Sequence, residues 1–499
     1  MSYKINLSDL DRDAPVSLTQ QLVDRFAAAI DSGELEPGEK LPPTRELAEL
    51  VGVNHLTAAR VYRRLAELGY VTASVGRGTF VRTLAPAGSA ELGDDWQIYA
   101  LPEHEVSYSE QVLTDAMSSA GQPGLISLAV GWPSPRLYPT EELASITADV
   151  FAEERGAALS YAPTEGLYAF REQLAERGRR FGFADEPEEV IVTSGAKQGI
   201  SLTARAVLEP GDVAVVESPT FAGLLDSLRQ TGARVIGVPV DEDGFDVTQL
   251  ERILTRHEVK LVGLQTACQN PTGRDISEER RTRLAELAVE RNFFVLEDRV
   301  YADANFSREP VRPLRELAPG HVIYVNSLSK MVGGGLRAGW VVARGPVHER
   351  IATLKLEDDF HSPTLIQHIA ARWLATGAYD RHLEDTKPFY RERRDALLAA
   401  LERHMPGEYQ ADSPQGGHHV WLTLDRPLDE RALYTEAARH GVAFIPGGAV
   451  TAERRTQTSM RLSFSLLDPP ELDEGVKRLA RAIREVRRRS RHAVAAPMS

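Results

Sequence analysis

Five short apolar runs, each ending in a polar residue, alternate with helical segments through the middle of this chain. The runs occupy residues 188–194, 212–218, 259–265, 293–298 and 322–327. Amphipathic segments such as 166–181 and 277–291 lie between them, and strands that alternate with helices predict a parallel sheet covered by helices. We therefore predict an α/β fold. Ligands of such sheets bind beyond the carboxyl ends of the strands, so the polar residues that end these runs are candidate site residues.

Length and composition limit the class of protein. A chain of 499 residues exceeds what one hydrophobic core usually organises, so more than one domain is expected. The single cysteine, Cys268, excludes an internal disulfide and a cysteine-based metal cluster, and we expect no metal site. No run approaches the roughly 20 apolar residues of a membrane span, and residues 1–13 contain no apolar signal core. We therefore expect a cytoplasmic protein without a membrane partner.

The first 82 residues have a different organisation from the middle of the chain. A first helix is predicted from apolar residues at helical spacing, namely Leu18, Leu22, Phe26 and Ile30. Thr44 is a candidate N-cap for a short helix over 45–50, and Asn54 is a candidate N-cap for a third helix. Residues 70–81 then alternate as two strands around Gly76–Gly78, which is typical of a hairpin with a glycine-rich tip. This order predicts a winged helix-turn-helix.

The charge of this segment is opposite to that of the whole chain. The chain carries a net charge of −14, but residues 44–82 contain six arginines against three glutamates. In a helix-turn-helix the start of the third helix enters the major groove, while helix N-termini and the wing suit the DNA backbone. The candidate DNA contacts are Arg45, His55, Thr57, Arg60, Arg64, Arg77 and Gly78. For any one arginine alone, a solvated surface position is the simpler interpretation.

Residues 12–82 resemble the GntR-type winged helix-turn-helix, most fully in LEPGEKLPPTRELAELVGVNHLTAARVYRRLAELGYVTASVGRGTFV, residues 35–81. The resemblance implies that double-stranded operator DNA is a partner, contacted by Arg45, His55, Thr57, Arg60 and Gly78. His55 departs from the family, in which a small or polar residue is commoner. We interpret residues 83–106 as a linker between this domain, residues 1–82, and a second domain over 107–499.

The polar strand ends of the second domain form a chemically consistent set. Residues 194–197 end one strand and begin a helix, where free amides and the helix dipole favour a phosphate. Asp298 ends a buried run, where a carboxylate needs a cationic partner such as a protonated pyridine nitrogen. Lys330 follows the last run, in a position suited to a Schiff-base lysine. Taken singly, pairing of Asp298 with Arg299 and a surface Lys330 are the simpler interpretations, but the set together points to one cofactor.

These residues and their order resemble the fold-type I aminotransferases that use pyridoxal phosphate, over about residues 107–485. The resemblance rests on SYAPTEGLYAFREQLAERG (160–178), VTSGAKQG (192–199), ESPTF (217–221), QNPTG (269–273), EDRVY (297–301), SLSK (327–330) and GLRAGW (335–340). It implies a mostly parallel central sheet with flanking helices in a large part over about 130–350. A smaller α+β subdomain would follow over about 380–485.

The same resemblance implies a role for each matching residue. Lys330 would form the internal aldimine with pyridoxal phosphate, and Asp298 would pair with the pyridine nitrogen, which keeps the ring an electron sink. Asn270 and Tyr301 would hydrogen-bond the ring hydroxyl, and Phe221 would stack on the ring. The phosphate would be held by Ser194, Gly195, Ala196, Lys197, Ser327, Ser329 and Arg337, with Tyr161 reaching the phosphate of the partner subunit. Arg461, in SMRLSFS (459–465), would bind a substrate α-carboxylate beside Gly131.

Two positions depart from the aminotransferase pattern. Lys197 stands where glutamine or another neutral residue is usual, and Gly333–Gly335 replaces a turn that more commonly contains proline. Neither departure removes a catalytic group.

A GntR-type head joined to an aminotransferase-like body resembles the MocR subfamily of transcription regulators over almost the whole chain. The resemblance implies a homodimer, usually head-to-tail, that senses an amino compound or pyridoxal phosphate through the Lys330 aldimine and changes its binding to paired operator half-sites. A sensor of pyridoxal phosphate alone is a subtype that Arg461 disfavours. The alternative is a working aminotransferase, converting an amino acid to a 2-oxo acid, with a secondary DNA-binding head. The intact head argues against that alternative, while the residues for aminotransferase chemistry also permit weak transaminase activity.

Overall fold

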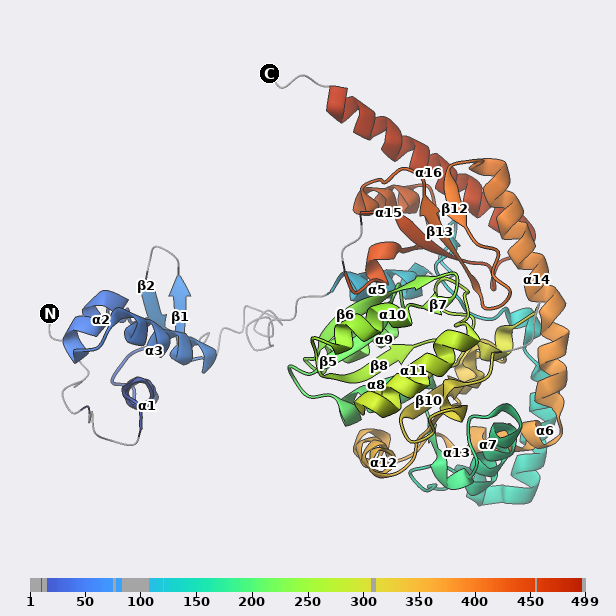
Figure 1. Cartoon of the computed structure of the whole chain (residues 1–499), viewed down its shortest axis with the longest axis horizontal. Coiled ribbons are helices and arrows are strands. Elements are labelled where there is room, and N and C mark those ends of the chain that lie inside the picture. The colour runs from blue at the N-terminus through green and yellow to red at the C-terminus, as the bar shows by residue number, and fades with distance from the viewer. Residues whose placement is uncertain are drawn as a thin grey trace. The chain divides into compact units, whose positions relative to one another are not determined.

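The computed structural model describes residues 10, 16–74, 78–82, 107–119, 121–306, 311–453 and 456–495. The chain forms two compact units, Met1–Glu105 and Val106–Ser499, and each has its own hydrophobic core (Figure 1). The linker interpreted over 83–106 and the predicted DNA contact Arg77 lie outside the described residues.

The first unit, called the head below, contains three helices followed by a two-stranded antiparallel hairpin. Its elements are α1 (Leu18–Asp31), α2 (Thr44–Val51), α3 (His55–Glu67), β1 (Val71–Ser74) and β2 (Gly78–Val81). The predicted cap of α3 is confirmed, because Asn54 Oδ1 accepts a hydrogen bond from the Thr57 amide at 3.0 Å. The predicted cap of α2 is wrong by one residue. The ring of Pro43 holds its φ at −54°, and Thr44 is already the first helical residue.

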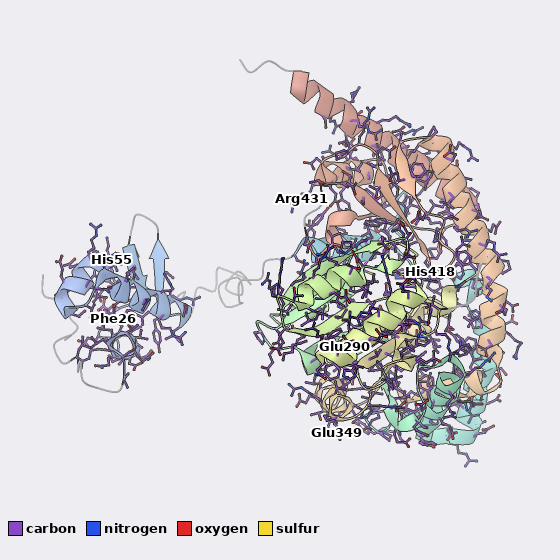
Figure 2. The ribbon with its side chains drawn as sticks, viewed as in Figure 1. Phe26, His55, Glu290, Glu349, His418 and Arg431 are labelled. Atoms are coloured by element: carbon purple, nitrogen blue, oxygen red, sulfur yellow. The ribbon has the colours of Figure 1, made fainter. Side chains whose placement is uncertain are left out.

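Apolar side chains from all three helices fill the core of the head. Phe26 of α1, labelled in Figure 2, packs edge-on against Tyr62 of α3, with 6.0 Å between the ring centroids. The Tyr62 hydroxyl donates a hydrogen bond to the carbonyl of Pro42 at 2.6 Å. This bond fixes α3 against the segment that enters α2.

A mixed eight-stranded sheet lies at the centre of the second unit. In spatial order its strands are β4 (Val190–Thr193), β11 (Gly339–Val342), β10 (Val322–Ser327), β9 (Phe294–Asp298), β8 (Val259–Leu264), β5 (Val213–Ser218), β6 (Arg234–Asp241) and β7 (Gly244–Phe245). Strands β10, β9, β8, β5 and β6 are parallel, whereas β11 is antiparallel to both of its neighbours. Strand β4 therefore runs in the same direction as β10, and the predicted parallel arrangement is confirmed for the five predicted runs.

Helices cover both faces of this sheet (Figure 1). The helices of the large part are α5 (Tyr108–Ser119), α6 (Thr140–Glu154), α7 (Tyr168–Phe181), α8 (Ala196–Val207), α9 (Ala222–Arg229), α10 (Val247–Leu254), α11 (Glu278–Arg291), α12 (Pro346–Asp359) and α13 (Thr364–Ala375). Val215 and Val262 pack with α10 and α11, while their neighbours Val216 and Leu261 pack with α8 and α9. This alternation buries the strands on both sides, as their continuous apolar runs require.

A smaller α+β subdomain follows the large part. Its sheet has the order β12 (Tyr409–Ala411), β13 (His419–Leu424), β16 (Ser459–Ser463) and β15 (Ile445–Pro446), and all neighbouring pairs are antiparallel. Its helices are α14 (Ala378–His404), α15 (Glu430–Arg439) and α16 (Pro469–Ala495). Helix α14 runs along one side of the unit and packs against α16 (Figure 1). The short strand β3 (Ile126–Ser127) pairs with β14 (Val442–Ala443), so residues before 130 also join this subdomain.

No helix within the described residues is both long enough and apolar enough to cross a membrane.

Candidate functional site

The predicted DNA contacts that fall within the described residues of the head lie on α2, α3 and the start of β2. Arg45 is exposed in the first turn of α2, and His55, Arg60 and Arg64 are exposed on α3 (Figure 2 labels His55). Thr57 is half-buried, and its amide is bound by the Asn54 cap. Gly78 is exposed and has a φ of +117° at the first residue of β2. The buried residues of α3 face the core of the head, which leaves its arginines in solvent.

In the second unit, the carboxyl ends of the parallel strands open onto a cavity of about 510 Å³. The predicted cofactor-binding residues that line it are Ala196, Lys197, Phe221, Asn270, Asp298, Tyr301, Ser327, Ser329, Lys330 and Arg337. Gly131 and Arg461, predicted to bind the effector, line the same cavity. Ser194, Gly195 and Tyr161 are not among its lining residues. Residues separated by more than 300 positions in sequence therefore meet at one place.

Asp298, the last residue of β9, is buried without a cation at ion-pair distance among the described residues. Its carboxylate accepts hydrogen bonds from Gln265 Nε2 at 2.8 Å and from the Val300 amide at 3.2 Å. Burial raises the pKa of the Asp298 carboxyl to about 6, although these bonds and the charge of Lys330 oppose the rise. The neighbouring Arg299 pairs with Glu297 instead, so the simpler interpretation of Asp298 as a partner of Arg299 is wrong.

Lys330 ends the short helical turn that follows β10. Its Nζ donates to the carbonyl of Gly131 at 3.2 Å and lies 5.4 Å from the centroid of the Tyr301 ring. The ammonium is half-buried in the cavity wall, so Lys330 is not a surface lysine.

The start of α8 and the loop after β10 form one end of the cavity. Helix α8 begins at Ala196, and Gly195 precedes it with a φ of +90°. A side chain at position 195 would lie 2.6 Å from the Arg337 guanidinium, so glycine is needed there for Arg337 to approach. The buried hydroxyl of Ser329 has no hydrogen-bond partner within the part of the chain that the structure describes. Free helix amides, a hydroxyl and a guanidinium are a donor set that suits a phosphate.

Arg461, on β16, lines the cavity and pairs with no acid among the described residues. It donates from Nη1 to Asn270 Oδ1 at 3.0 Å and from Nη2 to the carbonyl of Ala129 at 2.5 Å. Burial lowers the pKa of the guanidinium to about 10, which still leaves it charged at neutral pH. A charged arginine held only by neutral acceptors suits an anionic ligand such as a carboxylate.

Three predicted cofactor residues make other contacts. Lys197 Nζ donates to the carbonyl of Gly223 at 2.5 Å and to Ser227 Oγ at 2.8 Å, so its ammonium is tied to α9. The hydroxyl of Ser194 points to Asp359 at 3.4 Å, and its carbonyl accepts a bond from Arg337. Tyr161 is 90% exposed, and its predicted role concerns the partner subunit.

Two family models match the chain. Bacterial regulatory proteins of the gntR family match residues 18–81, and aminotransferases of class I and II match residues 124–479, well over half of the chain. The chain belongs to the class I and II aminotransferase family. A GntR head followed by an aminotransferase domain is the domain arrangement of MocR-type transcription regulators, and this chain has it.

Curated relatives of both kinds are similar to this chain. Aromatic-amino-acid aminotransferase 1 of Thermococcus litoralis is 36% identical over 72% of this chain and 88% of its own length. The probable rhizopine catabolism regulatory protein MocR of Rhizobium meliloti is 27% identical over 95% of each chain. Among solved structures, α-aminoadipate aminotransferase LysN of Thermus thermophilus, complexed with N-(5'-phosphopyridoxyl)-L-leucine, has a TM-score of 0.70 at 33% identity, covering 76% of this chain and 95% of its own.

The aminotransferase domain fits pyridoxal phosphate, the cofactor of this family. Asp298 is a buried carboxylate without a cationic partner among the described residues, and the protonated pyridine nitrogen would be such a partner. Among the described residues the hydroxyl of Ser329 has no partner, and with the amides of α8 it would suit the phosphate, while Lys330 would supply the amine that holds the aldehyde carbon. When bound, the cofactor serves as an electron sink for amino-acid chemistry.

Cofactor binding to the aminotransferase domain is expected to weaken in acid because of Asp298. The pKa of about 6 means that the carboxyl takes up a proton as the pH falls through 6 and then loses its attraction for the pyridinium. From this group the dissociation constant of pyridoxal phosphate is expected to rise about tenfold per pH unit below about 6. Absorbance titration from pH 8 to 5 measures it. Asp298→Asn removes the titrating carboxyl and with it this pH dependence. If the dissociation constants of wild type and Asp298→Asn changed with pH in the same way, Asp298 would not be the group that causes the dependence.

Sequence reasoning missed several residues that line the cavity or contact its wall. Gln265 ends one of the predicted runs. Its side chain donates a hydrogen bond to Asp298 and accepts one from the backbone N–H of Asn270, but an uncharged side chain at a strand end gave no distinctive signal. His419 lines the cavity and His418 lies next to it in sequence, fully buried. Helix α5 also contributes to the wall, through the apolar residues Leu113, Ala116 and Met117.

Proposed function

We propose that this protein is a transcription regulator in which an amino-acid ligand, bound at Lys330 and Arg461, changes how the heads bind operator DNA. One observation carries the proposal: the chain combines a winged helix-turn-helix with a cavity lined by Lys330, Asp298 and Arg461, which pairs with no acid among the described residues. A ligand regulates DNA binding only if it binds two arrangements of the protein differently.

The geometry of the cavity supports an α-amino acid with an apolar side chain as the ligand. Arg461 suits the α-carboxylate, and Lys330 marks the place of the amino group. Beyond them the wall is formed by Leu113, Ala116, Met117 and Ile445, none of which offers a charge to a distal carboxylate or amine. A charged side chain placed there would lose hydration without compensation.

Helix α5 provides a physical route for the response. It is the first described element after residues 83–106, which connect the two units, and its apolar face lines the cavity. Near its start, Ser109 Oγ donates to Asp226 Oδ1 on α9 at 2.7 Å, beside the Ser227 hydroxyl that Lys197 binds. A ligand that repacks α5 would therefore act on the connection to the head.

We infer a homodimer with paired operator half-sites, in a head-to-tail arrangement. Class I and II aminotransferase folds are commonly dimeric. Large apolar residues exposed on the second unit support a subunit interface, namely Leu159, Tyr161 and Phe360. Two-fold symmetry would present two heads to a palindromic operator.

The test uses the full chain loaded with pyridoxal phosphate. A panel of amino acids is added while the visible absorbance of the cofactor and the binding of a fluorescent fragment of the protein's own promoter are followed together. We expect amino acids with apolar side chains to change both signals, with aspartate and glutamate at least tenfold weaker. Arg60→Ala is the matched control, since it should weaken DNA binding and leave the absorbance response intact.

The second candidate function is that of a working aminotransferase. It is favoured by the retention of Lys330, Asp298 and Arg461 in one cavity and by the 36% identity to an aromatic-amino-acid aminotransferase. In the same experiment, steady formation of a 2-oxo acid without any change in DNA binding would support this candidate and contradict the regulator.

A further inference from the structure

Two consecutive histidines lie buried beside the cofactor cavity. His418 precedes β13 and His419 is its first residue, and Figure 2 labels His418 within the second unit. Both rings lie edge-on to Tyr301, with centroid distances of 5.3 Å and 5.4 Å. His419 also lines the cavity itself. The function proposed above assigns no role to either histidine.

Both ring nitrogens of His419 have a hydrogen-bond partner. Nε2 lies 3.0 Å from the Tyr301 hydroxyl, and Nδ1 lies 2.8 Å from Ser463 Oγ. Gly131 makes room for this ring, because a Cβ at position 131 would lie 2.1 Å from His419 Cε1. The imidazole is therefore held in one orientation between Ser463 and Tyr301.

The surroundings keep His419 uncharged. Burial lowers the pKa of its imidazole well below the usual value, and the nearby Arg461, His418 and Lys330 lower it further. Burial also lowers the pKa of His418, to about 3. The titratable groups that line this cavity are Tyr138, Lys197, Asp298, Tyr301, Lys330, Arg337, His419 and Arg461. A neutral imidazole carries one N–H, so one ring nitrogen of His419 donates a hydrogen bond and the other accepts one.

The direction depends on which group donates in the bond between Ser463 and His419. Ser463 Oγ lies 2.8 Å from His419 Nδ1 and 3.5 Å from the carbonyl of Ala129, so its contact with the imidazole is the shorter one. With the serine hydroxyl as donor of that bond, the imidazole proton lies on Nε2 and is directed at the Tyr301 oxygen. That oxygen then receives a hydrogen bond. Tyr301 has no other hydrogen-bond partner among the described residues, so its own proton is left for the cavity.

We propose that His419 is a positioning residue, which donates from Nε2 to the Tyr301 hydroxyl and thereby directs the Tyr301 proton to the ring hydroxyl of bound pyridoxal phosphate. A phenol that accepts a hydrogen bond is a stronger donor, because successive bonds polarise one another. The inference rests on the cofactor being held at Lys330 and is independent of any effect on DNA.

The test is the pH titration of the visible absorbance of the bound cofactor in His419→Phe. Donation by Tyr301 stabilises negative charge on the ring oxygen, and that charge otherwise helps to retain the proton on the nitrogen of Lys330. Weaker donation therefore raises the apparent pKa of the absorbance change, and we expect a rise of about half a unit or more. His419→Gln can place an amide N–H near the Nε2 position and is expected to restore most of the wild-type value.

Two comparisons separate this role from a merely structural one. His419→Asn keeps a polar side chain but is too short to reach Tyr301, so its apparent pKa is expected to rise as in His419→Phe. In a Tyr301→Phe background, replacing His419 is expected to add no further shift. An unchanged pKa in both His419→Phe and His419→Asn would overturn the proposal, as would a shift that persists without the Tyr301 hydroxyl. If His419→Phe fails to hold the cofactor, His419→Gln and His419→Asn are compared instead: a higher apparent pKa in His419→Asn than in His419→Gln supports the proposal, and equal values overturn it.

Discussion

Lys330→Ala is expected to abolish the visible absorbance of covalently bound pyridoxal phosphate while the head still binds DNA. Lys330 and Asp298 both line the cavity, whereas the head is a separate compact unit with its own core. Ligand-free DNA binding is therefore expected to stay within about twofold of wild type, roughly 0.4 kcal/mol. Addition of an amino acid should no longer change it. Absorbance spectroscopy and promoter binding measure the two effects on one sample.

Lys197→Gln is the matched control, because Lys197 is the other lysine that lines the cavity and its ammonium is tied to Gly223 and Ser227. This variant is expected to keep the covalent band. Borohydride reduction followed by mass spectrometry identifies the modified lysine directly. A reduced cofactor adduct on another lysine in wild-type protein, or an unchanged spectrum in Lys330→Ala, would remove Lys330 from its role.

The parts of the structure that the sequence predicted well depend on short-range patterns. Asn54 is three residues from the amide that it caps, and Asp298 ends the apolar run that forms β9. Because strands of one direction end at the same edge of a sheet, predicting the runs also placed Asp298 and Lys330 near each other. The cap at Thr44 was misplaced because a proline before a helix and a polar side chain at its start give almost the same sequence signal.

The parts that could not be predicted depend on contacts between distant residues. His419 meets Tyr301 across 118 positions, and no local pattern marks a histidine at the start of a strand as part of a cofactor site. The helical pattern of α5 predicts a buried face but does not say that Leu113 and Met117 face a cavity. Lys197 was predicted to contact the phosphate from its place in the motif, yet its side chain extends to α9, 26 residues further along the chain.

Arg461→Gln is expected to weaken the binding of amino acids about 100-fold or more, roughly 3 kcal/mol, and to leave cofactor binding nearly unchanged. The guanidinium lies in the cavity wall and pairs with no acid of the described residues, so a ligand carboxylate would add an ion pair there. Its loss leaves that carboxylate desolvated and opposite a neutral amide. The dissociation constant is measured from the change in cofactor absorbance as each amino acid is added.

The comparison ligand is an amine with the same side chain but no α-carboxylate. If Arg461 binds the carboxylate, this amine should bind wild type and Arg461→Gln within about threefold of each other, because it never made the lost ion pair. Equal losses for the amine and the amino acid would contradict the assignment and would mean that Arg461 acts through Asn270, which it contacts at 3.0 Å. Arg461→Lys separates charge from geometry. A lysine keeps the positive charge but lacks the two parallel N–H donors of a guanidinium. If two parallel hydrogen bonds hold the carboxylate, Arg461→Lys is expected to recover less than half of the lost binding free energy.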